Sequence, residues 1–371
     1  MIPVCRPTLL GNEKEYVVSC IEDNWISSNG QYIGKFEIDF PLWCGSKWGV
    51  ACSNGTTALH LALRCLDIKE GDEVIVPDFS IISTANAVKY CGATPVFVDS
   101  ELDTWNMNPE GIEQWITNKT KAIIVVHTYG CPADMDKIMA IAKKYNLKVI
   151  EDAAEAHGAE YKGNRVGSLG DIACFSFYAN KIITCGEGGM LVTKEKKYYD
   201  KAKSLRNLAF QMPRFIHHDI GYNYRMTNIQ AAIGCAQLEN ADDYVNMRKI
   251  NAQRYTKVLE TVPGITTPPD CPYGTNVYWM YGILVDEKEY GMSRDELMKR
   301  LEKNNIQTRT FFYPTHAQPI FGGKFSDEYK NSRFLWENGL YLPSSSDLTE
   351  EEIEKISFLI KQLARTTNGD N

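Results

Sequence analysis

The sequence predicts an α/β protein with a mostly parallel sheet and a smaller α+β C-terminal part. Through most of its 371 residues, short apolar runs alternate with helical patterns, the order that places helices on both faces of a parallel sheet. The apolar runs are nearly continuous in Val and Ile, as is typical of strands covered on both faces. The alternation ends after Val262-Pro263-Gly264. We therefore expect a large domain over residues 1–245 and a small C-terminal domain over residues 246–371.

Each expected element follows from these patterns. In the large domain, strands are expected at residues 48–52, 73–77, 94–99, 121–127, 148–152, 172–177 and 190–193. The helices between the first strands are expected at residues 57–66, 83–90 and 134–145, and a long helix follows at residues 228–251. No long helix separates the last two strands, so at least one of them is expected to run antiparallel. In the small domain we expect a loop at residues 266–272, a strand at 277–285, and helices at 293–304 and 348–363, with a frayed end at 366–371.

Composition and charge limit the classes of partner. Forty basic and 47 acidic side chains give a net charge of −7, and this acidic balance argues against a nucleic-acid partner. No apolar run reaches the ~18 residues that cross a bilayer, and the N-terminus lacks a signal-peptide core, so we expect no membrane partner and a cytoplasmic location. The eleven scattered cysteines favour reduced thiols. With the six histidines they form no metal-binding pattern, so no metal is expected.

A turn that fits a phosphate is the first candidate site. The run Ser53–Thr57 comes directly after a strand and opens a helix. Free backbone N–H groups and the helix dipole favour an anion at such a junction, usually a phosphate. Gly55 permits a close approach, and the hydroxyls of Thr56 and Thr57 add donors. An ordinary helix N-cap is the alternative. The glycine motifs for dinucleotides and nucleoside triphosphates are absent from the strand ends, so neither ligand is favoured.

A carboxylate and a lysine follow near other strand ends. Asp152 ends an apolar strand, where ligands of open α/β sheets bind, and a carboxylate there needs a partner such as a protonated ring nitrogen. Lys181 lies between an aromatic strand and a glycine-rich loop, where desolvation lowers the pKa of the amine and makes it nucleophilic. Taken singly, Asp152 fits a helix cap and Lys181 a surface turn. Together with the phosphate turn they fit pyridoxal 5′-phosphate (PLP), which requires a lysine for a Schiff base and a carboxylate for its pyridinium nitrogen.

Five segments resemble the sugar aminotransferases of the DegT/DnrJ/EryC1/StrS family. The resemblance extends from Pro7 to the terminal helix, and its motifs are specific. It implies the PLP-dependent transferase fold of type I, which is aspartate aminotransferase-like, and a homodimer with shared active sites. The segments that carry it are residues 53–63, 71–77, 151–158, 176–189 and 221–232.

The resemblance also implies cofactor contacts. Lys181 matches the lysine that bonds to PLP, Asp152 matches the partner of the pyridine nitrogen, and Glu155 lies where the family places a Gln or Glu beside the ring hydroxyl. Phe79 falls where an aromatic residue stacks on the cofactor ring. Asn223 matches an asparagine that reaches the phosphate from the neighbouring subunit. The residues that match phosphate contacts within one chain are Gly55, Thr56 and Ser176.

Three segments look most like those of family members that convert GDP-4-keto-6-deoxymannose into GDP-perosamine, which serves the synthesis of O-antigen and other lipopolysaccharide. These segments are residues 24–30, 221–232 and 308–316. The residues expected to line the nucleotide-sugar pocket, as in relatives, are Trp25, Tyr313 and His316. L-glutamate is the expected amino donor. Related PLP dehydratases carry a histidine in place of the lysine, so Lys181 favours transamination. The alternatives are a UDP- or dTDP-linked 3-keto- or 4-keto-6-deoxyhexose as substrate, or a noncatalytic PLP-binding homologue.

Overall fold

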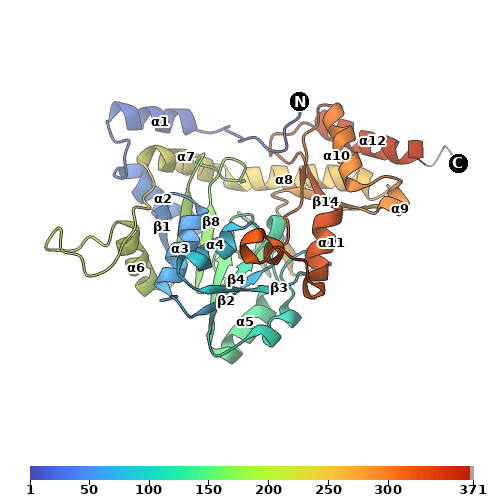
Figure 1. The fold of residues 1–371 in the computed structure, drawn as a ribbon. Coiled ribbons are helices and arrows are strands. Elements are labelled where there is room, and N and C mark those ends of the chain that lie inside the picture. Colours follow the sequence, from blue (N-terminus) through green and yellow to red (C-terminus); the bar gives the residue numbers. More distant parts are fainter. Residues whose placement is uncertain (368–371) are drawn as a thin grey trace.

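A seven-stranded central sheet organises the computed structural model, which describes residues 1–367 (Figure 1). The strand order is β1-β9-β8-β5-β4-β2-β3. All neighbouring strands pair in parallel except β9, which is antiparallel to both β8 and β1. This confirms the mostly parallel sheet and the antiparallel strand expected near its end. The strands are β1 (Trp48–Cys52), β2 (Glu73–Pro77), β3 (Thr94–Val98), β4 (Thr120–Val126), β5 (Lys148–Asp152), β8 (Ile172–Ser176) and β9 (Gly189–Thr193).

Helices cover both faces of this sheet, which explains why its strands are apolar throughout. In β2, Val74 and Val76 belong to one hydrophobic core and Ile75 to another, because successive side chains point to opposite faces. The first core includes residues of α3 (Gly55–Cys65), α4 (Ser83–Tyr90) and α6 (Lys196–Arg206). The opposite face packs against α2 (Gln31–Trp43), α5 (Met135–Tyr145) and α7 (Asn228–Glu239).

Two helices occupy the region predicted as one long helix over residues 228–251. Helix α7 ends at Glu239, and α8 (Ala241–Leu259) begins after Asn240. The prediction of a single helix was wrong because Asn240 leaves the helical backbone conformation, with φ −113° and ψ 15°. Both helices lie along one side of the molecule, and α1 (Glu13–Glu22) packs against α7 (Figure 1).

Helix α8 connects two hydrophobic cores. Tyr244 near its start is buried in the core that α2 and α7 share, whereas Tyr255 and Leu259 are buried in a separate core beneath the C-terminal strands. The side chains of one helix therefore stabilise both parts of the chain.

The C-terminal part contains a four-stranded antiparallel sheet, in the order β10-β12-β14-β13. The strand expected over residues 277–285 begins only at Tyr281, because Tyr278 has a left-handed φ of 49° and donates its N–H to Asn276 Oδ1. The elements are β10 (Ile265–Thr266), β12 (Tyr281–Val285), β13 (Arg309–Thr310), β14 (Gly339–Leu342), α9 (Glu287–Tyr290), α10 (Arg294–Lys303), α11 (Lys330–Asn338) and α12 (Glu350–Thr367). Because α12 continues to Thr367, only the rest of the tail expected to fray lies outside the described residues.

A third, small sheet connects the two parts of the chain. Its order is β11-β6-β7, so a strand from the C-terminal half pairs with a hairpin from the first half. The strands are β6 (Glu160–Tyr161), β7 (Asn164–Arg165) and β11 (Gly274–Thr275).

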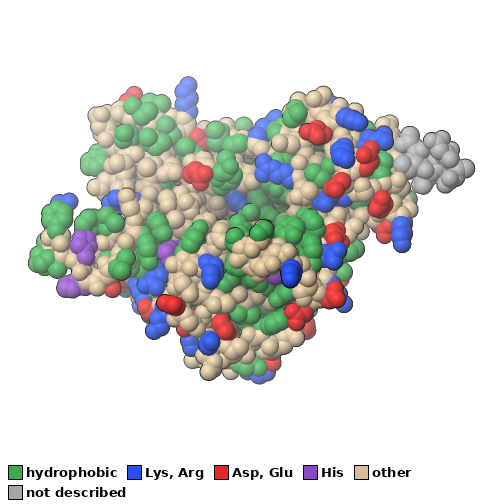
Figure 2. All heavy atoms as spheres, viewed as in Figure 1, with side chains coloured by type: hydrophobic (Ala, Val, Ile, Leu, Met, Phe, Trp, Pro, Cys, Tyr) green, Lys and Arg blue, Asp and Glu red, His purple; other side chains and the backbone are tan. Residues whose placement is uncertain are grey.

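The loop that follows α6 extends away from the body of the molecule, at the left of Figure 1. Its apolar side chains Met212, Phe215 and Ile220 are 88%, 73% and 84% exposed. Figure 2 shows hydrophobic and histidine side chains gathered on this projection. Within residues 1–367, no helix is both long and apolar enough to cross a membrane.

Candidate active site

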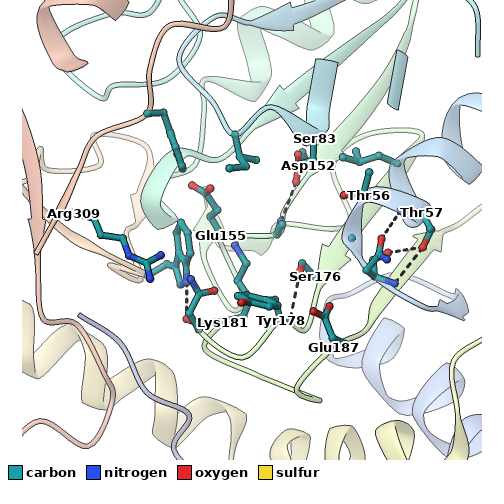
Figure 3. A pocket seen from close by; sticks show the side chains of 18 of the residues that line it. Thr56, Thr57, Ser83, Asp152, Glu155, Ser176, Tyr178, Lys181, Glu187 and Arg309 are labelled. Atoms are coloured by element: carbon teal, nitrogen blue, oxygen red, sulfur yellow. Dashed lines mark hydrogen bonds between the residues drawn. The ribbon is translucent and has the colours of Figure 1, made fainter. Parts of the chain in front are cut away.

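One cavity of about 630 Å³ lies at the carboxyl edge of the central sheet (Figure 3). Side chains from the ends of β5 and β8 meet the start of α3 there, together with residues from the C-terminal part. The structure thus brings together residues that the sequence analysis singled out separately. Those that line the cavity are Gly55, Thr56, Thr57, Asp152, Glu155, Ser176 and Lys181.

The start of α3 offers unpaired N–H groups to the cavity. Asn54 caps the helix: its Oδ1 accepts the N–H of Thr57 at 2.9 Å, and the Thr57 hydroxyl in turn donates to the Asn54 carbonyl at 2.8 Å. Thr57 therefore serves the cap rather than an anion. The N–H groups of Gly55 and Thr56 have no partner in the described part of the chain. The positive end of the helix dipole adds to them, which makes this turn suited to a phosphate.

Ser176 lies directly against this turn. A Cβ atom on Gly55 would lie 2.8 Å from the Cβ of Ser176, so only glycine lets the helix begin this close to the serine. The hydroxyl-bearing side chains of Thr56 and Ser176 line the same cavity as Gly55 (Figure 3). A phosphate of a bound cofactor fits this donor set.

Asp152 presents a buried carboxylate to the cavity. It is only 3% exposed, and it accepts hydrogen bonds from the Thr84 hydroxyl at 2.9 Å and from the Ala154 N–H at 3.3 Å. Burial raises the pKa of Asp152, and the Thr84 hydrogen bond offsets this only in part. A protonated ring nitrogen in the cavity would stabilise the charged form. This carboxylate therefore fits the pyridinium partner that PLP needs.

Lys181 and Glu155 are the other titratable groups at the centre of the cavity. Burial lowers the pKa of the Lys181 amine, while the charges of Glu155 and Asp152 act in the opposite direction. Burial raises the pKa of Glu155 to about 7, although Lys181 and the Tyr129 N–H, which donates to Glu155 Oε2 at 2.9 Å, favour its charged form. A lysine with a lowered pKa is a nucleophile and a proton acceptor at neutral pH.

Phe79 does not reach the cavity, so the prediction that it stacks on the cofactor ring was wrong. Its ring is fully buried and packs against Tyr129, Phe311 and Phe312, with centroids 5.7–5.9 Å apart. These rings belong to a core between the central sheet and the C-terminal strands, which takes up the aromatic side chain. Ile81 is the apolar residue of this segment that lines the cavity.

His316 is held inside the protein and does not line the cavity, so its assignment to a nucleotide-sugar pocket stays a prediction. Its Nε2 accepts the N–H of Ser326 at 3.3 Å, so Nδ1 carries the proton and donates to Asp78 Oδ2 at 2.8 Å. The ring also stacks on Tyr329, with centroids 4.1 Å apart. Because both ring nitrogens are engaged, His316 connects its own loop to the end of β2 rather than offering a free group to a ligand.

Three other predicted residues lie outside the cavity of a single chain. Trp25 is 54% exposed and lines a separate hollow with Tyr32 and Asn228. Tyr313 packs edge-on against an aromatic neighbour, Trp336, at 4.7 Å. Asn223 is exposed next to the projecting loop. Their roles toward a substrate or a second subunit therefore remain predictions.

Sequence reasoning missed several residues of the site. Thr84 holds Asp152, and Trp279 and Arg309 reach the cavity from the C-terminal part. A signal existed for Arg309, because it lies in the segment 308–316 that resembles relatives acting on a GDP-linked sugar. No sequence signal pointed to Trp279, which precedes β12 by two residues.

Comparison with known proteins identifies the family. The chain matches the family model for the DegT/DnrJ/EryC1/StrS aminotransferases over residues 7–361. It is 48% identical over 353 residues to GDP-perosamine synthase of Escherichia coli O157:H7, with 95% of each chain covered, and 44% identical over 366 residues to GDP-perosamine synthase of Caulobacter vibrioides, with 98% of each covered. The solved structure of the aminotransferase TlmJ from Streptoalloteichus hindustanus superposes with a TM-score of 0.93 at 29% identity, covering 100% of both chains. These findings confirm the family resemblance and the fold expected from it. The chain belongs to the DegT/DnrJ/EryC1/StrS aminotransferase family, whose cofactor is PLP.

Proposed function

We propose that this chain transfers the amino group of L-glutamate to GDP-4-keto-6-deoxymannose and so forms GDP-perosamine. The observation that carries the proposal is the single cavity in which Lys181, Asp152 and the open start of α3 meet. Two relatives at 48% and 44% identity are both named GDP-perosamine synthase, which favours a GDP-linked substrate over a UDP- or dTDP-linked one. The intact lysine argues against a noncatalytic homologue.

The cofactor contacts follow from the donor set of the cavity. The N–H groups of Gly55 and Thr56, with the hydroxyls of Thr56 and Ser176, hold the phosphate. Glu155 lies beside the ring hydroxyl. When bound, PLP supplies a carbon that carries the amino group and a ring that accepts negative charge. Asp152 keeps a proton on the ring nitrogen, and this fixed charge stabilises the transition state.

Lys181 is the proposed catalytic residue for proton transfer. Burial lowers the pKa of its amine, so more of it is neutral near pH 7 than for an exposed lysine. The neutral Nζ removes the proton from the α-carbon of glutamate in the first half of the cycle. In the second half it delivers a proton to carbon 4 of the sugar.

Arg309 is the proposed contact for a carboxylate of the donor. Lys181 and Arg309 are the two basic side chains that line the cavity, and Arg309 forms no ion pair within the described residues. A guanidinium binds a carboxylate through two parallel hydrogen bonds. We expect Arg309→Leu to raise the KM for glutamate roughly 10- to 100-fold, the value of a lost charge-assisted hydrogen bond, and Arg309→Lys to restore it only in part. A raised KM for the sugar alone would assign Arg309 to the diphosphate instead.

We further propose a homodimer with shared active sites. The projecting loop exposes Met212, Phe215 and Ile220, and such an apolar surface is typical of a protein contact. Asn223 lies beside this loop, where it is available to the cavity of a second chain, and Trp25 and Tyr313 are assigned to the sugar-binding part of that assembly. Mixing Lys181→Ala with Asn223→Ala, after subunit exchange, should restore about a quarter of the wild-type sites, because one site of each mixed dimer is intact. No recovery in a proven mixed dimer would reject shared sites.

The two-domain division is also part of the proposal, with the boundary near residue 245. Support comes from α8: Val245 packs in the core of the large part and Ala252 in the core of the C-terminal part.

We also propose a cytoplasmic location, which the state of the thiols supports. All eleven cysteines are free, and all but Cys5 and Cys271 are buried, as is typical of proteins in a reducing compartment.

The substrate is tested by assaying the PLP-loaded protein with L-glutamate and a panel of GDP-, dTDP- and UDP-linked keto sugars. Mass spectrometry should detect the amino sugar from GDP-4-keto-6-deoxymannose, with one 2-oxoglutarate for each amine formed. Lys181→Ala should form none, and Lys324→Ala, an exposed control, should match wild type. Product from a dTDP- or UDP-linked sugar alone would overturn the GDP substrate. Full turnover by Lys181→Ala would overturn the mechanism.

A further inference from the structure

Trp279 forms a wall of the cavity directly against Lys181. The Nζ atom of Lys181 lies 3.6 Å from the centre of the indole ring, and both side chains line the same cavity. Trp279 is 4% exposed, and Lys181 is partly buried. A cation within about 6 Å of an indole face is attracted by the negative face of the ring, and more strongly when water is excluded.

Trp279 is held by one hydrogen bond from its indole and one to its backbone carbonyl. Its Nε1–H donates to the carbonyl of Asn180 at 2.8 Å, and the carbonyl of Trp279 accepts from Nη1 of the buried Arg248 at 2.9 Å. Before it, the Val277 N–H donates to the carbonyl of Gly130 at 3.1 Å. Since Asn180 directly precedes Lys181, one of these anchors ties the ring to the backbone that carries the lysine. The ring and the amine therefore keep their relative position.

The other groups around Lys181 do not fix its amine. Its Nζ has no hydrogen-bond partner in the described part of the chain. The titratable groups whose charges act on it are Asp152 at the end of β5, Glu155 just after that strand, and Cys5 from the N-terminal segment. The charge of Lys181 in turn acts on His157, further along the same segment. These groups act through their charge at longer range, whereas the indole face touches the amine. The contact with Trp279 is thus the one that sets where the amine lies.

We propose that Trp279 is a positioning residue, whose indole face holds the Lys181 amine in one place whenever that amine is free. This rests on the proposed role of Lys181. An amine on a flexible four-carbon stem otherwise occupies several rotamers and must be ordered before it reacts. The indole face also favours the ammonium over the neutral amine. Trp279 therefore raises the pKa of the Lys181 amine, whereas burial lowers it, and both protonation states of the amine remain accessible.

The test replaces Trp279 alone with tryptophan analogues that carry one to four ring fluorines, introduced at that codon in the full-length chain. Fluorine weakens the negative face of the ring while its size and its N–H are nearly retained. In the cofactor-free protein, the pKa of Lys181 is read from the pH dependence of its acetylation by acetic anhydride, followed by mass spectrometry. We expect the pKa to fall with each fluorine, by about 0.5–1 unit over the series, so that acetylation below the pKa becomes about 3- to 10-fold faster.

Matched controls separate this effect from a change in packing. The same analogues at Trp105, which is buried among Tyr129 and Phe311, should leave the pKa of Lys181 unchanged. A pKa that stays constant across the series at Trp279, or that shifts equally for both tryptophans, would overturn the proposal. Because acetylation is measured without substrate, the result does not depend on whether the proposed sugar is correct.

A second measurement tests positioning in the PLP-loaded enzyme. Trp279→Phe keeps an aromatic face and should retain most of kcat, whereas Trp279→Leu should lower kcat about 10-fold with little change in the KM of either substrate. Equal loss of kcat in both variants would show that volume, not the aromatic face, matters, and would also overturn the proposal.

Discussion

Glu151 and Asp152 are neighbours on β5, both are acidic and both are buried, yet their surroundings differ. Glu151 accepts four hydrogen bonds, from His127 Nε2 at 3.2 Å and from the N–H groups of Gly167, Leu169 and Gly170 at 2.8–2.9 Å. Asp152 accepts two within the described residues, from Thr84 and Ala154. Because successive side chains of a strand point to opposite faces, one carboxylate lies in the core and the other faces the cavity.

The difference in donors gives the two carboxyl groups opposite pKa shifts, although burial raises both pKa values. Burial raises the pKa of Glu151, but the hydrogen bonds from His127 and the backbone outweigh it, so its pKa lies below the usual value. Burial also raises the pKa of Asp152, and its few donors leave that pKa high. His127 accepts the Ala133 N–H at Nδ1, so it donates to Glu151 from Nε2. A fully bonded carboxylate stabilises the fold, whereas an incompletely bonded one keeps bonding capacity for a ligand.

The largest effect is expected for Glu151, the carboxylate whose hydrogen bonds are all made. Glu151→Gln places an amide N–H₂ against backbone donors and should lower the free energy of unfolding by about 3–5 kcal/mol near pH 7. The lowered pKa means that Glu151 stabilises the fold above its unfolded pKa and loses this contribution as the pH falls through its folded pKa. Urea unfolding at several pH values measures the effect. A loss of activity with unchanged stability would contradict the structural role of Glu151.

Asp152→Asn should have the opposite signature. We expect kcat to fall roughly 10²- to 10³-fold, because a neutral amide no longer holds the proton on the ring nitrogen. The unfolding free energy of the cofactor-free protein should stay the same or rise, because an incompletely bonded buried carboxylate is removed. Steady-state kinetics and urea unfolding of the same preparation test both parts. If Asp152→Asn destabilises as much as Glu151→Gln, the distinction between the two neighbours fails.

Glu155, which also faces the cavity, should make the stability of the cofactor-free protein depend on pH. Burial raises its pKa from 4.5 to about 7, so between these values the folded protein binds a proton that the unfolded chain has lost. The cofactor-free protein should therefore lose stability as the pH rises through this window. At about 1.4 kcal/mol per pKa unit, the loss is on the order of 3 kcal/mol. Thermal unfolding from pH 4.5 to 8 measures it, and Glu155→Gln should flatten that profile.

The smallest effect is expected at Thr84. Thr84→Val keeps the shape of the side chain and removes one of the two donors to Asp152, so the pKa of Asp152 should rise further. We expect kcat to fall roughly 10-fold, with Thr84→Ser near wild type because it keeps the hydroxyl. Comparing the pH profiles of kcat for the two variants isolates this bond. Identical profiles would mean that Thr84 does not tune Asp152.

The sequence was informative where local chemistry determines structure. The ranges predicted at 73–77 and 148–152 match β2 and β5 in full, because strands covered on both faces are apolar at every position. Lys181 and Asp152 could be assigned to one cavity because strand ends and a helix start meet at the carboxyl edge of a parallel sheet. Their roles remain predictions, since these depend on a ligand.

The remaining parts depend on contacts between distant segments. The sequence predicted Phe79 as a ring-stacking residue. In the structure Phe311 and Phe312, which lie far along the chain, enclose it in a core. Trp279 reaches the cavity only because the C-terminal part folds back onto the sheet. No spacing or periodicity in the sequence encodes such packing.

Helix α8 has a consequence for how the molecule unfolds. Tyr244 and Tyr255 anchor one helix in two cores, so neither core can melt without losing part of its own packing. Heating should therefore produce a single cooperative transition in a calorimeter, despite the separate sheets. For the same reason, cleavage by a protease near residue 260 should not release a folded C-terminal fragment. The two parts of the chain should resist or undergo proteolysis together.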